Sequence, residues 1–479
     1  MPNVLLLTTP ETPTFTSNFG YPIGLMYIAS YLRKHTNCEV RIIDLKITKL
    51  NKDELLHTIR ENSYQYIGIS GMSFESESIN SLTKNIKAEL PDTKIIIGGP
   101  YASCEDYHDI LKNKSIDYIV KGEGEEVFEK LITAIENGNP TPTIPGLIYK
   151  KNGKTTIHDN IIPSQPLDNY PFPAWDLINI EKYHKKRQSL FYKYKRQMTI
   201  VTSRGCPYQC IYCHSIFGKK HRTRSAENVF KEIEYLYKTY NIQEFYIADD
   251  GFNLDIARAE KICDLIIESN IKIGILFPNG LRADRMEVSL LQKMKKAGVF
   301  YIGYSVETAS KRLQKYIKKN NDLDKLLYIV EETAKLNIFT RGYFMLGFPT
   351  ETISEIKETI NFSLKAKFHA TTFFIVTPNP GTELFDITKQ KIPSHKKDIK
   401  SFHYHNALGY SISEVPDDKI QKLRQKAILL HMLNPTQLLR TLKVLFIICG
   451  FNIFPQIFRA FKINFTVFIH RYKENKCQK

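Results

Sequence analysis

The sequence predicts an α/β protein in which a doubly wound parallel sheet is followed by a second α/β domain and a helical C-terminal tail. In the N-terminal third, short apolar runs alternate with helical patterns, and the same alternation returns over residues 198–380. An amphipathic helical pattern then covers Asp417 to Met432. These observations divide the chain into four expected segments: a first domain over 1–137, a connector over 138–195, a second domain over 196–385 and a helical region over 386–479.

The composition is that of an ordinary globular protein with a strong positive charge. The 479 residues are 42% hydrophobic and 24% charged, which is enough for two or three domains with cores of their own. The net charge of +17 favours acidic partners such as an anionic membrane surface, a phosphorylated substrate or nucleic acid, although lysine-rich coding explains it equally well. Eight cysteines without a paired framework, and an N-terminus that enters a strand without a signal peptide, predict a cytoplasmic location.

Five apolar runs in the first domain are predicted strands: Val4 to Thr8, Val40 to Leu45, Tyr66 to Met72, Lys94 to Gly98 and Asp117 to Lys121. Such runs are typical of a parallel sheet with helices on both faces, and ligands of these folds bind beyond the carboxyl ends of the strands. Glycine at a strand end lets a backbone approach a large ligand, but it is also ordinary turn chemistry. The candidate binding residues at these ends are Thr9, Ser70, Gly71, Ser73, Gly98, Gly99, Gly122 and Glu123.

The connector is rich in proline, which breaks any long helix. Within it, Leu147 to Lys151 and Lys154 to His158 flank Asn152-Gly153 and are predicted to form a hairpin. Basic residues greatly outnumber acidic ones over 176–224. This excess indicates attraction of an anionic substrate or an electron donor, or simply a solvated face.

One loop carries three cysteines, Cys206, Cys210 and Cys213, at CxxxCxxC spacing after a predicted strand. Three thiolates on so short a loop can converge on one inorganic centre, and thiolates suit zinc, copper(I) or iron–sulfur clusters. A closed zinc site needs four protein ligands, as does an ordinary four-iron cluster. A four-iron cluster held by three cysteines therefore leaves one iron open to a substrate or cosubstrate. The alternatives are a zinc site completed by His214 or His221, or a disulfide with one spare thiol.

The motif, with Tyr212 before its third cysteine, resembles the signature of the radical S-adenosylmethionine (SAM) family. The resemblance implies a [4Fe–4S] cluster on Cys206, Cys210 and Cys213, whose open iron binds the amino and carboxylate groups of SAM. It also implies reductive cleavage of SAM to a 5'-deoxyadenosyl radical, which abstracts hydrogen from unactivated carbon. The expected fold of this domain is then a partial (β/α)6 barrel, with its active groups at the carboxyl ends of the strands.

The second domain contains the six strands that such a barrel needs: Met198 to Thr202, Glu244 to Ala248, Lys272 to Phe277, Phe300 to Val306, Thr340 to Leu346 and Thr372 to Thr377. Helices between them are predicted to begin near Ser225, Asp255, Asp284, Asp322 and Ser354. The residues that follow the strands resemble family segments around SAM, and carboxylates among them are able to accept hydrogen bonds from its ammonium group. The resemblance therefore implies SAM contacts from Tyr212, Asp249, Asp250, Asn279, Arg282, Ser305, Glu307 and Gly347.

The first domain resembles the Rossmann or flavodoxin-like cobalamin-binding domain that precedes the radical SAM domain in one large subfamily. The matching features are Tyr21-Pro22-Ile23-Gly24-Leu25, Asp44, Gly98-Gly99-Pro100 and the Gly-Glu-Gly-Glu stretch from Gly122. The DxHxxG motif, whose histidine ligates cobalt in many cobalamin proteins, is missing, because no histidine precedes His35. We therefore expect cobalamin to bind without a histidine from that motif.

The last part of the chain is predicted to be helical and close to the barrel. Pro378 to Phe385 resembles the segment that closes such barrels, and the family often places residues such as His403, His405 and Tyr410 near the substrate, although lone surface histidines are the more ordinary interpretation. Val444 to Phe458 is an uncharged run shorter than the roughly 20 residues that span a bilayer. It is predicted to lie on a membrane surface with basic anchors, or to pack on the barrel.

The resemblance implies a cobalamin-dependent radical SAM enzyme that methylates an unactivated carbon. The alternatives are a radical cyclisation, rearrangement or hydroxylation without methyl transfer, and a non-enzymatic cobalamin or redox sensor. The strand-end segments argue against a sensor, which needs no intact SAM pocket. The expected partners are a small-molecule or lipid-like substrate, a flavodoxin- or ferredoxin-type electron donor and a peripheral membrane contact, and no nucleic acid is expected.

Overall fold

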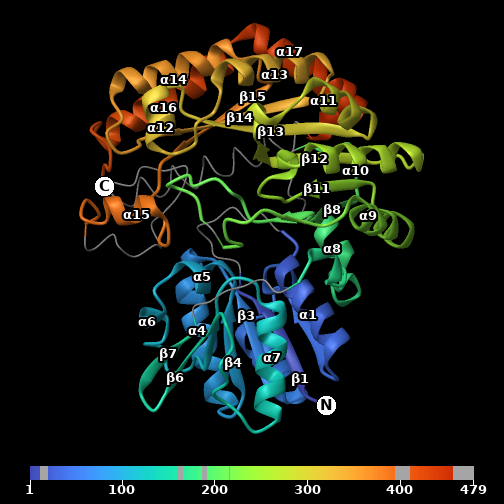
Figure 1. Ribbon diagram of the computed structural model, residues 1–479, viewed down its shortest axis with the longest axis vertical. Helices are drawn as coiled ribbons and strands as arrows, with labels where there is room; N and C mark the ends of the chain where they lie inside the picture. Colours follow the sequence, from blue (N-terminus) through green and yellow to red (C-terminus); the bar gives the residue numbers. More distant parts are fainter. Residues whose placement is uncertain (11–19, 159–164, 186–190, 215, 394–409, 457–479) are drawn as a thin grey trace.

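The computed structural model describes residues 1–10, 20–158, 165–185, 191–214, 216–393 and 410–456. Two α/β units are stacked along the long axis of the molecule, and the last two helices, α16 (Asp417–Met432) and α17 (Pro435–Cys449), lie on the second unit, away from the first (Figure 1). The described residues form a seven-stranded sheet, a six-stranded sheet and a two-stranded ladder.

The first sheet has the order β2-β1-β3-β4-β5-β6-β7, and its first five strands are parallel. Its strands are β1 (Asn3–Thr8), β2 (Glu39–Ile43), β3 (Tyr66–Ser70), β4 (Lys94–Gly98), β5 (Tyr118–Val120), β6 (Leu147–Lys151) and β7 (Lys154–Ile157). The strand order reverses between β1 and β3, and ligands of doubly wound sheets bind at such a switch point. The predicted hairpin is confirmed, and it continues this sheet because β6 pairs antiparallel with β5.

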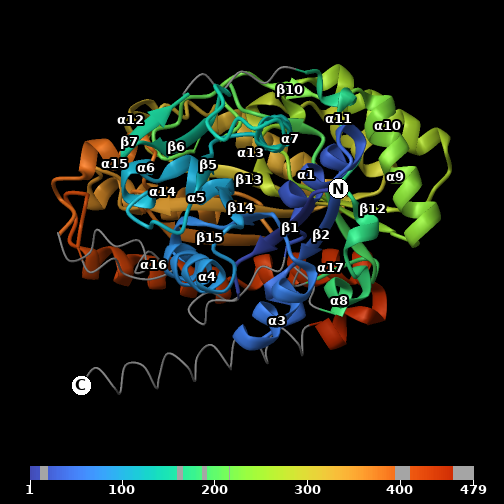
Figure 2. The same cartoon turned by 90° about the horizontal axis from the view of Figure 1, so that it is seen from below.

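The helices of this unit are α1 (Ile23–His35), α2 (Leu45–Thr48), α3 (Lys52–Asn62), α4 (Ser76–Glu89), α5 (Gly99–Cys104), α6 (Tyr107–Ile110) and α7 (Glu125–Glu136). Val4 and Leu6 of β1 belong to the core that contains α1 and α7, whereas Leu5 and Leu7 belong to the core that contains α3 and α4. Figure 2 shows these two pairs of helices on opposite faces of the sheet. Burial on both faces explains the uninterrupted apolar runs in the sequence, and the predicted doubly wound fold is confirmed.

The second sheet is parallel throughout and has the order β15-β14-β13-β12-β11-β8. Its strands are β8 (Gln197–Ile200), β11 (Glu244–Ile247), β12 (Gly274–Leu281), β13 (Val299–Glu307), β14 (Phe339–Leu346) and β15 (Ala370–Ile375). The helices are α9 (Ala226–Tyr240), α10 (Ile256–Glu268), α11 (Val288–Lys296), α12 (Lys311–Tyr316), α13 (Leu323–Lys335) and α14 (Ile353–Lys365). All six predicted strands are present, in the strand order that successive βα units of a partial barrel produce.

Most helix starts follow from capping side chains that are visible in the sequence. Ser225, Asp255 and Asp322 each accept a hydrogen bond from a backbone amide in the first turn of the following helix. The prediction at Asp284 was wrong, because Asp284 lies in the short 3-10 turn η5 (Ala283–Arg285) and its carboxylate binds Arg282, so that α11 begins only at Val288.

The connector joins the two units through one continuous apolar core. Trp175, in η3 (Trp175–Leu177), is 1% exposed, and its indole Nε1 donates to Glu232 of α9 over 3.3 Å. The ring of Tyr21 meets Trp175 edge-on, while the Tyr21 hydroxyl donates to the backbone of Gln197 at the start of β8. The connector also contributes η2 (Leu167–Asn169) and α8 (Ile180–Lys185). Because this core includes residues of both units, their relative placement is part of the fold.

The tail folds back onto the barrel through α15 (Glu383–Thr388), α16 (Asp417–Met432), α17 (Pro435–Cys449) and η8 (Gly450–Asn452). One side of this segment packs on inner residues of the barrel. The packed side chains are Val444, Leu445 and Cys449 of α17 and Ile453, which follows it. The other side is exposed and apolar. By length and composition Pro435–Gln456 is able to cross a membrane, with a mean hydropathy of 1.6 and 22% of its apolar window buried.

Candidate active site

The cysteine loop is closed at its base by a short ladder. β9 (Ser203–Arg204) pairs antiparallel with β10 (Arg222–Thr223), so that the three cysteines lie on the loop between them. Asp249, which follows β11, accepts hydrogen bonds from the Thr202 amide at 2.6 Å and from the Ser203 hydroxyl at 2.7 Å. Asp249 is buried, and these hydrogen bonds hold the start of the loop in place. The same residue is a predicted SAM contact.

The three thiols lie close together but are not arranged as a closed metal site. Among the described residues, no three side chains of Cys, His, Asp or Glu have metal-binding geometry. Burial first, and then the neighbouring Cys210 and Cys206, raise the pKa of Cys213 to about 11, so the three sulfur atoms are within electrostatic range of one another. Thiolates hold iron–sulfur clusters, and ligation requires their deprotonation. The donor set of three clustered thiols therefore fits a cluster with one open iron.

A buried lysine, Lys319, faces this group of thiols. Its ammonium lies 3.3 Å from Glu307 and lowers the pKa of both Cys206 and Cys213, which burial otherwise raises. Glu307 also accepts a hydrogen bond from Tyr212. The backbone of Glu307 is left-handed with φ of 68°, which costs about 1 kcal/mol or more for a non-glycine residue. Such strain at the end of β13 is typical of a functional site.

Three predicted SAM contacts lie near the carboxyl ends of β12 and β13 and are held by neighbouring side chains. The Arg282 guanidinium lies 3.9 Å from the ring centroid of Tyr208, a residue of the cysteine loop, and binds both oxygens of Asp284. Asn279 accepts a hydrogen bond from the Tyr246 hydroxyl at 2.7 Å. Ser305 lies on β13 beside Gly280, at whose position a Cβ atom would be 2.2 Å from the Ser305 hydroxyl oxygen.

Gly347, after β14, is held by a buried acid. The amides of Gly347 and Phe348 donate to one carboxylate oxygen of Glu351 at 2.5 and 3.1 Å, and the other oxygen has no hydrogen-bond partner. Burial raises the pKa of Glu351 from 4.5 to about 8.

Asp250 also has a raised pKa, caused first by burial and then by the neighbouring Asp249.

The candidate cobalamin residues come together where β1, β3 and β4 end. A Cβ atom at Gly71 would be 3.2 Å from the Thr9 methyl group, and one at Gly99 would be 2.4 Å from the Ser70 hydroxyl oxygen. Gly99 also has φ of 77°, so a side chain is excluded there by both conformation and space. The Thr9 hydroxyl is buried without a hydrogen-bond partner. The glycines at these strand ends let a large ligand approach the backbone, and the unpaired Thr9 hydroxyl is able to bind a polar group of that ligand.

The other predicted members of this set lie close by. Ser73 hydrogen-bonds to Glu105, and the Gly122 amide donates to the Ser103 hydroxyl at 3.0 Å. Gly98 precedes Gly99 at the end of β4. His35 is instead the last residue of α1, which starts beside the strand ends and extends about 20 Å away from them. His35 stacks on Tyr31, which fits the expectation that it plays no part in cobalamin binding.

Glu123 takes part in a buried ion-pair cluster between the two units. Arg204 of β9 binds Glu123 at 2.5 Å and Glu125 at 2.7 Å, and Arg222 of β10 also pairs with Glu123. The side chains of Arg204, Glu123 and Glu125 are each less than 10% exposed. The cluster fixes the base of the cysteine loop to the first domain. A cobalamin contact from Glu123 stays a prediction, since its carboxylate has these structural partners.

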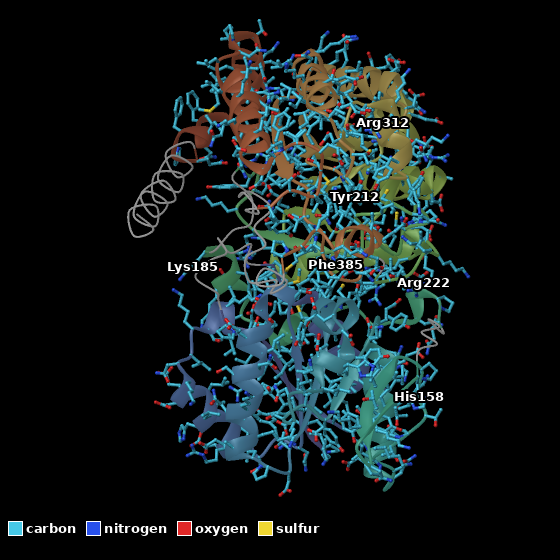
Figure 3. All side chains as sticks on the ribbon, turned by 90° about the vertical axis from the view of Figure 1, so that its left-hand side faces the viewer. His158, Lys185, Tyr212, Arg222, Arg312 and Phe385 are labelled. Atoms are coloured by element: carbon cyan, nitrogen blue, oxygen red, sulfur yellow. The ribbon has the colours of Figure 1, made fainter. Side chains whose placement is uncertain are left out.

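A second contact across the same junction joins the cysteine loop to α5. The Cys104 sulfur is 3.2 Å from Nδ1 of His214, the residue after Cys213. A Cβ atom at Gly381 would be 2.9 Å from the Cys104 carbonyl oxygen, so the barrel-closing segment also packs here. In Figure 3, Arg222 and Phe385 lie at the level where the two units meet, with Tyr212 above them in the barrel.

Sequence reasoning missed Arg204, Arg222, Lys319 and the contact between Cys104 and His214. The basic excess over 176–224 was the one available signal, and the sequence-based interpretation assigned it to an external anion. Part of that excess instead pairs internally, since Arg224 also binds Glu232 at 2.5 Å. His403 and His405 lie outside the described residues, and Tyr410 packs near Tyr212 and Phe348.

Two family models match the chain in the places that this geometry indicates. The model of the B12 binding domain matches residues 16–132, and that of the radical SAM superfamily matches residues 200–363. This protein is a cobalamin-dependent radical SAM enzyme. The predicted cofactors are therefore confirmed as a [4Fe–4S] cluster, SAM and cobalamin, and the prediction of an enzyme is confirmed over that of a sensor.

Three curated relatives are similar over most of their length. An uncharacterized methyltransferase of Pyrococcus horikoshii is 28% identical over 91% of this chain and 94% of its own. The cytidylyl-2-hydroxyethylphosphonate methyltransferase of Streptomyces wedmorensis is 26% identical over 79% of this chain and 80% of its own. The anaerobic magnesium-protoporphyrin IX monomethyl ester cyclase of Synechocystis is 27% identical over 85% of this chain and 81% of its own.

A solved structure has the same fold. The radical SAM methyltransferase TsrM of Kitasatospora setae superposes with a TM-score of 0.68 at 18% identity, covering 82% of this chain and 77% of its own. This similarity supports the arrangement of a first α/β domain, a radical SAM barrel and C-terminal helices. The individual SAM and cobalamin contacts named above stay predictions.

We predict that Glu123→Gln destabilises the folded protein by about 3–5 kcal/mol, because it leaves the Arg222 guanidinium without a carboxylate partner among the described residues. Urea unfolding of the cofactor-free protein measures this loss. Glu234→Gln is the control, since its pair with Lys238 is exposed and should change the free energy of unfolding by less than about 1 kcal/mol. Unchanged stability with loss of cobalamin binding would instead make Glu123 a ligand contact.

We also predict that Glu351 makes stability depend on pH. Its pKa is about 8 in the folded protein and 4.5 ordinarily, so between these values the folded protein holds a proton that the unfolded chain has released. Stability should therefore fall as the pH rises from 4.5 to 8, by up to about 1.4 kcal/mol per pH unit. Glu351→Gln should remove this dependence in unfolding experiments at pH 5, 7 and 8.5, whereas the exposed Glu358→Gln should keep it. A parallel pH profile for Glu351→Gln and wild type would contradict this prediction.

Proposed function

We propose that this enzyme transfers a methyl group to an unactivated carbon of its substrate. When bound, SAM at the cluster supplies the radical that activates this carbon, and cobalamin supplies the methyl group. The main support for this proposal is that the predicted cobalamin site and the cysteine loop are held next to each other. The strand ends of the first sheet and the cysteine loop are joined by the ion pairs of Glu123 and by the contact between Cys104 and His214.

The chain's own residues position the reactants and exclude water. The ladder of β9 and β10 and the carboxylate of Asp249 hold the cysteine loop in place. The buried Lys319 places a positive charge beside the thiols, and charge in such a buried site acts more strongly than in water. Two relatives are named methyltransferases, which supports methylation.

The second candidate function keeps the radical chemistry without methyl transfer. A relative of similar identity is named a cyclase, which favours an oxidative cyclisation as the alternative. The two functions differ in their by-products. Methyl donation by SAM leaves S-adenosylhomocysteine, whereas reductive cleavage leaves 5'-deoxyadenosine.

We expect anaerobically purified protein to carry about four irons. With substrate and a low-potential reductant, it should form S-adenosylhomocysteine and 5'-deoxyadenosine in about equal amounts, together with a product heavier by one methyl group. Cys210→Ala should abolish 5'-deoxyadenosine formation, because the cluster loses one of its three ligands.

Cys263→Ala is the matched control, because Cys263 is buried in the core beside α9 and far along the chain from the loop. 5'-Deoxyadenosine without any methylated product would rule out methyl transfer and leave the cyclisation alternative. Zinc in place of iron would contradict the radical chemistry as a whole.

We further propose a peripheral contact with an anionic membrane on the cytoplasmic side. The tail exposes a set of large apolar side chains, which we call the tail face: Leu429, Leu430, Met432, Leu433, Leu438, Leu439, Leu442, Phe446, Ile447, Phe451 and Phe454. An apolar face of this size on a chain of net charge +17 has the chemistry of an interfacial helix. A lipid-like substrate follows naturally from such a location.

The electron donor is proposed to be of the flavodoxin or ferredoxin type. Lys219 and Lys220 are exposed on the cysteine loop and give an acidic donor protein a point of attraction close to the cluster ligands. This assignment is independent of the choice between methylation and cyclisation.

The membrane contact predicts that the protein binds vesicles containing phosphatidylglycerol and that added salt weakens this binding. Leu439→Glu with Phe451→Glu should weaken it at least ten-fold in a sedimentation assay, because both side chains are more than 60% exposed on the tail face. Tyr328→Glu, which alters an exposed aromatic residue on α13, is the control. If the double variant binds like wild type, the tail face does not contact the membrane.

A further inference from the structure

The inner face of the barrel carries an unusual set of side chains. Along β14, Arg341, Tyr343 and Met345 are partly exposed, whereas Gly342 and Phe344 between them are buried against the helices. The register places Arg341 opposite Gly303 and Tyr343 opposite Ser305 on β13. Side chains of one strand alternate between its two faces, so Arg341 and Tyr343 point into the barrel with Ser305.

Three tyrosines form one wall of this interior, which we call the tyrosine wall: Tyr246, Tyr301 and Tyr343. The hydroxyls of Tyr301 and Tyr343 are 3.4 Å apart, and the Tyr343 hydroxyl donates to the Pro278 carbonyl at 2.6 Å. A Cβ atom at Gly303 would be 2.6 Å from the Tyr343 ring, so glycine makes room for this wall.

The tail closes the amino-terminal end of the same interior. Val444, Leu445 and Cys449 of α17 pack with Tyr301 and Phe339, the inner residues nearest the starts of β13 and β14. The opposite end carries the cysteine loop and the predicted SAM contacts. The inner face is therefore apolar at one end, aromatic along its wall and catalytic at the other end.

Arg341 is the exception in this interior, because its charge has no acidic partner among the described residues. Its Nε atom is buried without a hydrogen-bond partner, and its guanidinium carbon lies 5.9 Å from the centroid of the Tyr301 ring. Among the described residues, the buried arginines Arg204, Arg224 and Arg282 each bind a carboxylate, and the buried Arg258 donates to the backbone carbonyls of Arg224 and Thr202. A guanidinium inside a protein without such a partner is costly, and an anion that binds there removes the cost.

A second unpaired polar atom faces the same interior. Thr199 of β8 lies opposite Tyr246 in the register, and its hydroxyl is buried without a partner. Purely structural stacking of Arg341 on Tyr301 explains neither unpaired group. Three strands separate β14 from β8, so an acceptor oxygen at each position would be needed to pair the two groups.

We propose that Arg341 binds an anionic group, a carboxylate or a phosphate, at one end of the substrate, with the apolar or aromatic body of the substrate along the tyrosine wall. This inference rests on the proposed function in placing the reacting carbon at the carboxyl ends of the strands. Arg341 lies on β14, and Gly347, directly after the strand, is six residues further on, which is roughly 20 Å along an extended chain. The substrate class is thus an elongated, mostly apolar molecule with one acidic end.

The test measures binding directly, by isothermal titration calorimetry on the full-length, cofactor-loaded protein. The probes are 4-phenylbutyrate, phenyl phosphate and the uncharged 4-phenylbutanol. Wild type should bind at least one acid ten-fold or more tightly than the alcohol, and the tighter of the two acids distinguishes a carboxylate from a phosphate substrate. Arg341→Gln should abolish the preference, and Arg341→Lys should retain part of it because it keeps the charge.

Lys195→Gln is the matched control, since Lys195 is exposed in a basic surface depression of about 760 Å³ with Lys185, Lys193 and Arg196. Equal binding of acids and alcohol by wild type, or equal losses in Lys195→Gln and Arg341→Gln, would overturn the inference. Melting temperatures of all variants identify any that fail to fold, in which case Arg341→Lys decides. Product analysis of SAM turnover tests the proposed function separately, because anion binding is read without turnover.

Discussion

The buried ion-pair cluster of Arg204, Arg222, Glu123 and Glu125 is the interaction on which the site depends. It holds the base of the cysteine loop on the first domain, where β5 ends. Buried ion pairs of this kind add little net stability, but breaking one leaves an uncompensated charge, so they specify one arrangement over others. Here the specified arrangement brings the strand ends of the first sheet against the loop of the second domain, and the proposed methyl transfer requires this proximity.

The same junction explains why the two units share a core. Trp175 and α1 are buried between the first sheet and α9, so the units cannot separate without exposing a continuous apolar surface. The contact between Cys104 and His214 adds a polar link one residue from a cluster ligand. Movement of the first domain would therefore be transmitted to the loop through three kinds of contact: apolar, ionic and hydrogen-bonded.

The C-terminal tail has a side that packs on the barrel and a side that is exposed. Its packed side closes the interior beside Tyr301 and Phe339, and its exposed side carries the tail face. The sequence-based interpretation treated packing on the barrel and lying on a membrane as alternatives. Both sides of α17 are apolar. One side packs against the barrel interior that contains Arg341, and the other side is available for a bilayer.

The sequence by itself determined the strands, most helix starts, the three cysteines and the family, because these depend on local spacing and periodicity: Ser225 and Asp322 cap helices through neighbouring amides, and CxxxCxxC lies on one short loop. Only the tertiary structure decided which charges meet. Glu123 and Arg204 are 81 residues apart, and the barrel places no acidic partner beside Arg341 among the described residues. Ion pairs between residues so far apart in the sequence depend on how the two units pack together. Local sequence patterns do not predict that packing.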